Sequence, residues 1–86
     1  MRALAEVPGA TAVHVRTLTG KTTTVRVGLK QPVAVLKERI CLAEGIPADQ
    51  QRIIFAGQQL KDDKTLAFYR VHAGTSLHLV LKLCGC

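Results

Sequence analysis

The sequence predicts a small α+β domain in which a β-sheet packs on one helix. Two observations predict this class: segments with alternating apolar and polar residues near both ends of the domain, and one long stretch with helical spacing between them. The chain has 86 residues, enough for one layered core but not for two domains. Because 48% of the residues are hydrophobic and 21% are charged, the composition is that of a folding chain.

Two strands joined by a tight turn are predicted at the start of the domain. In residues 12–17, the apolar Val13 and Val15 alternate with the polar His14 and Arg16, as in a strand with one buried face. Residues 22–27 are rich in β-branched side chains, which favour strands. Because a glycine-containing turn at 18–21 separates the two segments, we expect a β-hairpin.

A helix is predicted from Pro32 to Glu44. Apolar residues recur there at three- and four-residue steps and form one stripe, which consists of Val33, Leu36, Ile40 and Ala43. Proline suits the first helical position because its missing N–H would have no partner there, whereas Gln31 is a poor N-cap. Gly45 stands where a left-handed residue ends a helix, and the following proline prevents continuation.

The second half of the chain predicts three more extended segments. Residues 52–55 form a strand, and a turn leads to a short strand at 58–60. A helical turn follows at 65–69, and residues 76–83 form the last strand, in which leucines alternate with other residues. The predicted order is strand, strand, helix, strand, short strand, strand.

One helix can cover only one face of this sheet, so the other face is expected to be open to water. The residues expected to face the helix are Val13, Val15, Val25, Val27, Ile53, Leu77 and Leu79. Ile54, His78 and Val80 then point away from the helix. Contiguous exposed apolar side chains mark interaction sites, whereas single ones are ordinary on protein surfaces, and the pattern alone leaves both interpretations open.

Several short motifs resemble the ubiquitin family, in the same order and at the same spacing. They include residues 17–22 (TLTGKT), 44–47 (EGIP), 49–52 (DQQR), 54–57 (IFAG) and 77–81 (LHLVL). The resemblance extends from residue 11 to residue 86 without a gap. It implies the β-grasp fold, an α+β architecture with a mixed sheet packed on one helix. We therefore expect a flexible extension at 1–10, a ubiquitin-like domain at 11–83 and a tail at 84–86.

The resemblance also implies a protein-binding patch on the open face of the sheet. The residues that match the family's apolar docking surface and its polar rim are Leu18, Ile54, His78, Val80, Arg52 and Gln59. Three of them are the residues that the alternation already leaves exposed. The implied function is noncovalent binding of ubiquitin-receptor domains in protein degradation or signalling. The expected partners are ubiquitin-binding domains, including proteasome receptors and enzymes of the ubiquitin–proteasome pathway.

The C-terminal tail departs from the family pattern, which ends in two glycines and is conjugated through the last carboxylate. The conjugation tail corresponds here to Lys82, Leu83, Gly85 and Cys86. Because the terminal glycine is replaced, we expect that the protein is not conjugated. A covalent modifier or its precursor is the alternative, and Lys21 and Lys37 match two acceptor lysines of the family. A further alternative is a protein anchored to a membrane by lipids on Cys84 and Cys86.

Other classes of function have little support in the sequence. No nucleophile and base stand at a readable catalytic spacing, and the terminal cysteines lack further ligands for zinc, so we expect no enzyme activity, metal or cofactor. The net charge of +6 is spread along the chain and aromatic residues are only 3%, so specific nucleic-acid binding is not expected. We expect a monomer in the cytoplasm and nucleus.

Overall fold

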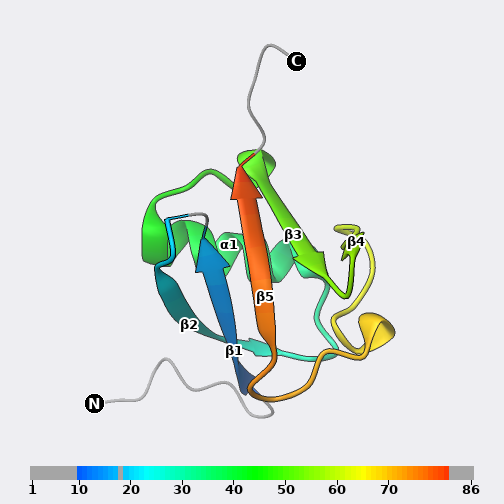
Figure 1. The fold of residues 1–86 in the computed structure, drawn as a ribbon. Coiled ribbons are helices and arrows are strands. Elements are labelled where there is room, and N and C mark those ends of the chain that lie inside the picture. The colour runs from blue at the N-terminus through cyan, green and yellow to red at the C-terminus, as the bar shows by residue number, and fades with distance from the viewer. Residues whose placement is uncertain (1–9, 18, 82–86) are drawn as a thin grey trace, which may run out of the picture.

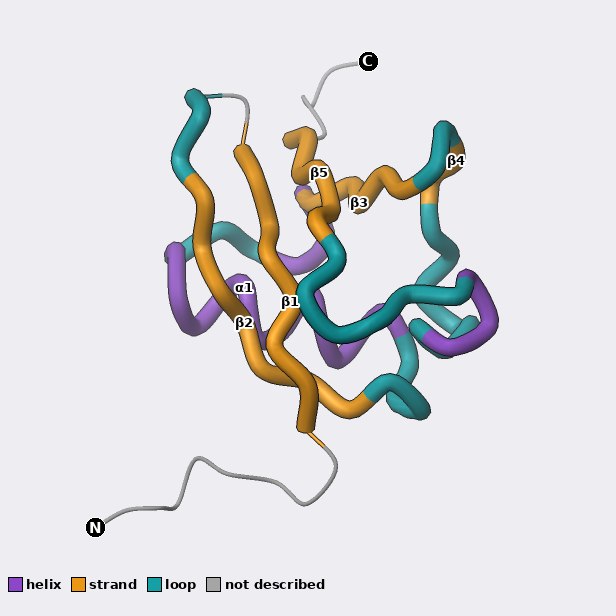
Figure 2. The backbone as a smooth tube through the Cα atoms, turned by 60° about the horizontal axis from the view of Figure 1, so that its bottom comes forward, coloured by secondary structure: helices purple, strands orange, loops and turns teal. Residues whose placement is uncertain are grey.

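The structure is a computed structural model that describes residues 10–17 and 19–81. Its strands and helices are β1 (Ala10–Thr17), β2 (Thr22–Gly28), α1 (Val33–Glu44), η1 (Ala48–Gln50), β3 (Gln51–Phe55), β4 (Gln58–Gln59), η2 (Ala67–Tyr69) and β5 (Ser76–Leu81). The strands of the described residues form one sheet in the order β2-β1-β5-β3-β4, and α1 crosses one face of it (Figures 1 and 2). The predicted class and order of elements are confirmed.

The sheet is mixed, because its first and last strands run side by side. β1 pairs with β2 in the antiparallel sense and with β5 in the parallel sense, in a register that aligns His14 with Ser76 and Thr17 with Leu79. β3 is antiparallel to both β5 and β4. The neighbouring interior strands β1 and β5 therefore come from opposite ends of the domain (Figure 1).

The core lies between the sheet and α1, and in the described residues it is built of valine, leucine and isoleucine. The sheet contributes all the residues that were expected to face the helix, namely Val13, Val15, Val25, Val27, Ile53, Leu77 and Leu79. The helix contributes three residues of its predicted stripe, Val33, Leu36 and Ile40. The remaining members of the core follow β3 in the chain: Leu60, Leu66 and Val71.

One member of the predicted helical stripe was wrong. Ala43 is exposed, and the buried face of α1 includes Lys37 instead. The stripe is therefore turned toward Lys37, and in the last turn the helix approaches the sheet through Glu44, which hydrogen-bonds to β2. Periodicity alone favoured the alanine because it treats a lysine as a solvent-facing residue.

The first N–H groups of α1 find hydrogen-bond acceptors in the backbone of a loop that is distant in the sequence. Pro32 is the N-cap, one position later than the predicted Gln31, and no side chain caps the helix. The N–H groups of Val33 and Ala34 instead donate to the carbonyl oxygens of Lys64 and Asp62, at 2.8 and 3.2 Å. These bonds supply acceptors for amides that lack partners within the helix, which explains why a poor capping sequence is tolerated here.

The other predicted boundaries that lie within the described residues differ from the structure by at most two residues. β1 begins at Ala10, within the segment predicted to be an extension, and η2 begins at Ala67. Residues 82–83, predicted to continue the last strand, lie outside the described residues. At the other end of α1, Gly45 has a φ of +76° and its N–H donates to the carbonyl oxygen of Cys41, so the predicted left-handed end of the helix is confirmed.

An ion pair fixes Lys37 at the edge of the core. Its Nζ lies 2.6 Å from Oδ1 of Asp62, and 8% of the lysine side chain is exposed, against 61% for the aspartate. The pair joins α1 to the same loop that supplies carbonyl groups to the helix N-terminus. Losing one member of such a pair leaves a charge without compensation in a partly dry environment.

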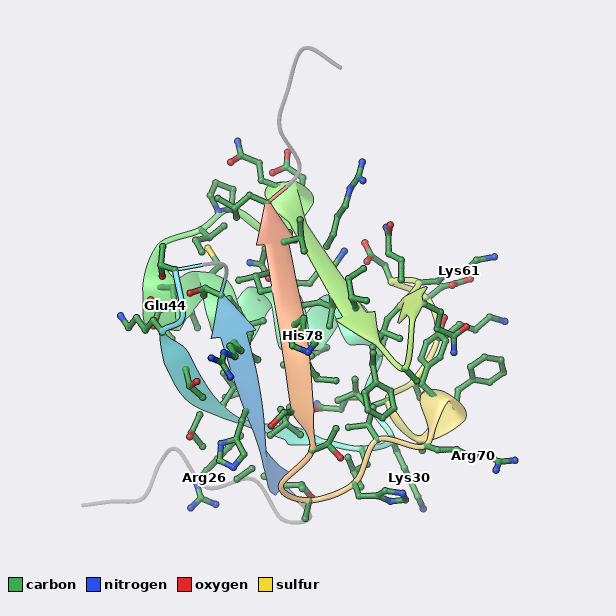
Figure 3. The ribbon with its side chains drawn as sticks, in the orientation of Figure 1. Arg26, Lys30, Glu44, Lys61, Arg70 and His78 are labelled. Atoms are coloured by element: carbon green, nitrogen blue, oxygen red, sulfur yellow. The ribbon has the colours of Figure 1, made fainter. Side chains whose placement is uncertain are left out.

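At the other end of α1, Glu44 joins the helix to the β1–β2 hairpin (Figure 3). Its Oε2 accepts a hydrogen bond from the Thr23 hydroxyl at 2.6 Å, and its Oε1 accepts one from Lys21 Nζ at 3.0 Å. The Thr23 hydroxyl first, and Lys21 second, lower the pKa of Glu44 from its ordinary value. Both bonds stabilise the charged carboxylate, so they favour the folded state when Glu44 is ionised.

We predict that Asp62→Asn lowers the free energy of unfolding by about 1–3 kcal/mol, because Lys37 loses its counter-charge. Urea unfolding followed by circular dichroism measures the change. Asp63→Asn is the matched control, because Asp63 is an exposed neighbour, and it should change stability by less than about 0.5 kcal/mol. Equal stability of the two variants would contradict the role given to the ion pair.

A second prediction concerns the pH dependence of stability. A carboxyl whose pKa is lowered by folding stabilises the folded state above its unfolded pKa, and this contribution is lost as the pH falls through the folded pKa. Thr23→Val should therefore raise the pKa of Glu44 and reduce stability at neutral pH, with a smaller reduction at about pH 3. Urea unfolding at both pH values and NMR titration of Glu44 provide the test, with Thr22→Val as control, because Thr22 is an exposed neighbour on β2. A loss of stability that is the same at both pH values would argue against this linkage.

Candidate protein-binding surface

The helix-free face of the sheet carries a contiguous set of side chains from β3, β4 and β5. Ile54 stands opposite His78 of β5 on one side and opposite Gln59 of β4 on the other. Arg52 stands opposite Val80. Directly opposed residues have Cβ atoms about 5 Å apart, and residues two apart on a strand share a face. Five of the six predicted patch residues are therefore brought together.

These five residues form an apolar centre with a polar rim, which we call the docking patch (Arg52, Ile54, Gln59, His78 and Val80). Ile54 and Val80 are half-buried but do not belong to the apolar residues packed against the core. Arg52, Gln59 and His78 are exposed. Figure 3 shows His78 on the side of β5 that faces away from α1. The sixth predicted residue, Leu18, lies outside the described residues.

An apolar cavity of about 410 Å³ adjoins this patch at the end of β5. Its lining residues are Thr17, Thr19, Lys21, Glu44, Ile46, Leu79, Val80 and Leu81. Val80 belongs to both surfaces, and Leu81 is 44% exposed. Ile46 and Leu81 were not among the residues predicted for the binding site. An apolar residue between Gly45 and Pro47 was the available signal, but its position beside β5 depends on the path of the loop.

The two candidate acceptor lysines have different surroundings. The side chain of Lys21 is 63% exposed, and its Nζ bonds to Glu44 at the surface. Lys37 is nearly buried in its ion pair with Asp62, so acylation of its amine requires that this pair opens first. The predicted conjugation tail, Lys82 to Cys86, lies outside the described residues.

The described residues show little that belongs to other classes of function. They contain no cluster of three or more His, Cys, Asp or Glu side chains that could hold a metal ion. Cys41 is a free, half-buried thiol on α1. Within the same residues no helix has the length and apolar character that crossing a bilayer requires.

Comparison with known proteins identifies the family. Residues 13–84 match the model of the ubiquitin family. The chain is similar to Ubiquitin-like protein 1 of Schizosaccharomyces pombe, at 45% identity over 73 residues, which are 85% of this chain and 94% of the relative. Its identity to Ubiquitin-like protein NEDD8 of Dictyostelium discoideum is 44%, over 85% of this chain and 95% of that protein.

A third relative carries a matching segment within a much longer protein. It is Ubiquitin domain-containing protein DSK2b of Arabidopsis thaliana, 38% identical over 71 residues, which are 83% of this chain and 13% of that protein. The match covers most of the chain in each case, and the mixed sheet packed on one helix is the architecture that the resemblance implied. The chain therefore belongs to the ubiquitin family and has the β-grasp fold.

Proposed function

We propose that the protein is a noncovalent interaction module, not an enzyme, which binds ubiquitin-receptor domains in the cytoplasm and nucleus. The observation that supports this most is the register of β3, β4 and β5. It places Ile54, His78 and Val80 side by side on a face that α1 does not cover. A contiguous apolar surface with a polar rim is typical of protein-binding sites.

The dimensions of the docking patch indicate the kind of partner. Its apolar centre spans two neighbouring strands, which lie about 5 Å apart, and this width suits one face of an amphipathic helix. Arg52 at the rim favours a helix with acidic residues beside its apolar stripe. Because the area is small, we expect dissociation constants of about 10–1,000 μM, or about −7 to −4 kcal/mol.

The first test of this function is a substitution in the centre of the patch. Ile54→Ala should weaken binding of a receptor helix about tenfold, because it removes apolar contact area from both sides of the interface. Titration of the ¹⁵N-labelled protein with a ubiquitin-interacting helical peptide gives the affinity and the perturbed amides. Leu42→Ala is the matched control, because Leu42 is exposed on α1 and should leave the affinity unchanged. Unperturbed amides at residues 54, 78 and 80 would refute the proposal.

A covalent modifier is the second candidate function. It is supported by relatives that the chain spans almost completely, among them the NEDD8 of Dictyostelium discoideum, of which it covers 95%. The replacement of the last glycine by Cys86 counts against it, because a side chain must then fit where the resemblance implies none. The exposed Lys21 is the better of the two candidate acceptors on this reading.

A thioester assay separates the two candidate functions. With ubiquitin-activating enzyme and ATP, we expect no thioester band for this chain. Cys86→Gly is the informative companion variant, because it restores two terminal glycines and leaves the docking patch unchanged. A band formed by the unaltered chain, and removed by a reducing agent, would contradict the noncovalent proposal and support the modifier.

A further inference from the structure

The loop between β4 and β5 carries an exposed aromatic side chain. Phe68 of η2 is 61% exposed, whereas Phe55 and Tyr69 are half-buried. An aromatic ring carries a large apolar area, and removing that area from water is favourable. Because single exposed apolar residues are ordinary on protein surfaces, the support of this ring and its neighbours decide whether it marks a site.

Hydrogen bonds hold the turn that presents Phe68. Its N–H donates to the Thr65 hydroxyl at 3.0 Å, and the Tyr69 hydroxyl accepts a bond from the N–H of Lys61 at 2.9 Å. The Tyr69 ring packs against the core and stands edge-on to the Phe68 ring, with 5.0 Å between the ring centroids. Leu66, two residues before Phe68, is fully buried. The exposed ring therefore belongs to a well-anchored part of the fold.

Basic side chains surround this ring. Lys64 Nζ lies 5.1 Å from the centroid of the Phe68 ring, which is a cation–π contact. Arg70 is exposed two residues after Phe68. Lys30 is exposed beside η2, since the carbonyl oxygen of the preceding residue accepts a hydrogen bond from the N–H of Ala67 at 2.8 Å. Figure 3 shows three of the basic residues on the same side of the molecule: Lys30, Lys61 and Arg70.

The acidic residues of this loop do not cancel the positive charge. Asp62 is engaged with Lys37 in the ion pair described above. Asp63 is the one other acidic residue in the sequence between Lys61 and Arg70. The region around the exposed ring is therefore basic with an apolar centre, and we call it the aromatic–basic surface (Lys30, Lys61, Lys64, Phe68 and Arg70).

The surface of a bilayer that contains anionic lipids complements both properties. Phenylalanine can enter the boundary between headgroups and acyl chains, and each lysine or arginine near an anionic bilayer adds attraction. Long basic side chains keep their charge among the headgroups while their stems contact apolar atoms. Lipids also move laterally, so their headgroups can follow the positions of the basic side chains. A protein partner would instead need a pocket shaped for one phenyl ring.

We propose that the aromatic–basic surface is a membrane-contact site, which binds bilayers that contain anionic lipids. Phe68 enters the interface, and the basic side chains contact the lipid headgroups. The contact is peripheral and reversible, because one aromatic side chain and a few charges give weak anchoring. The site goes beyond the proposed function, because it shares no residue with the docking patch.

Phe68→Trp gives the full chain a single fluorescent reporter, because the sequence contains no tryptophan. With vesicles of equal parts phosphatidylcholine and phosphatidylserine, we expect its emission to move to shorter wavelength as the ring leaves water. Vesicles of phosphatidylcholine alone should bind at least about fivefold more weakly. Leu42→Trp is the matched control, because Leu42 is an exposed apolar residue on α1, and its emission should not move.

Charge variants test the basic side chains by co-sedimentation with the same vesicles. Arg70→Asn should weaken binding about fivefold, and asparagine tolerates the φ of +63° at this position. Arg39→Gln is the matched control, because it removes the same charge beside Arg26, on the side of the molecule opposite Arg70 (Figure 3). Its effect should stay within about twofold. Asp63→Asn removes a negative charge and should strengthen binding about threefold.

Four outcomes would overturn the proposal. They are an unchanged emission of Phe68→Trp with the anionic vesicles, equal binding to phosphatidylcholine alone, equal effects of Arg70→Asn and Arg39→Gln, and the same emission change with inorganic phosphate or soluble poly-glutamate in place of vesicles. The last result would assign the surface to soluble anions or to an acidic protein.

Ile54→Ala separates this site from the proposed function. It should weaken binding of the receptor helix and leave vesicle binding unchanged, because Ile54 lies in the docking patch. If the receptor helix fails to bind while the vesicles bind, the proposed function alone is overturned. If the vesicles fail to bind while the receptor helix binds, the membrane-contact site alone is overturned.

Discussion

The parallel ladder between β1 and β5 is the interaction on which the other elements depend. It joins the first and last strands of the domain and places them at the centre of the sheet, where Val13, Val15, Leu77 and Leu79 face α1. β2 and β3 are then added on either side through antiparallel pairing. The described residues contain one long helix, which covers one face of the sheet. The opposite face of β5 is therefore not covered by α1.

Much of this arrangement could be predicted from local patterns. Alternation in β1, β2 and β5 identified the buried residues of the sheet, and Gly45 marked the end of the helix. Successive side chains of a strand point to opposite faces, so identifying the buried residues also identified the exposed ones. Ile54, His78 and Val80 were assigned to the helix-free face in this way. Such patterns depend on residues close together in the sequence, so they can be interpreted without knowing how the strands and the helix pack.

The features that were missed depend on contacts between distant segments. Lys37 is buried because Asp62 lies beside it. Neither the periodicity of the helix nor the charge of the lysine predicts that Asp62 will be its neighbour. The same is true of Ile46, which lines the cavity beside Val80 only because the loop after α1 passes close to β5. The aromatic–basic surface includes Lys30 only because the turn after β2 lies beside η2.

The support that residues 62 and 64 give to the helix N-terminus has a consequence for synthesis of the chain. The amides of Val33 and Ala34 are synthesised about 30 residues before the carbonyl groups of Lys64 and Asp62 that accept their hydrogen bonds. Until that later loop emerges, the first turn of the helix must fray or remain hydrated. The parallel ladder imposes a still later delay, since β5 is the last strand made. We therefore expect the nascent chain to stay unfolded through most of its translation and to acquire its structure in one late, cooperative step.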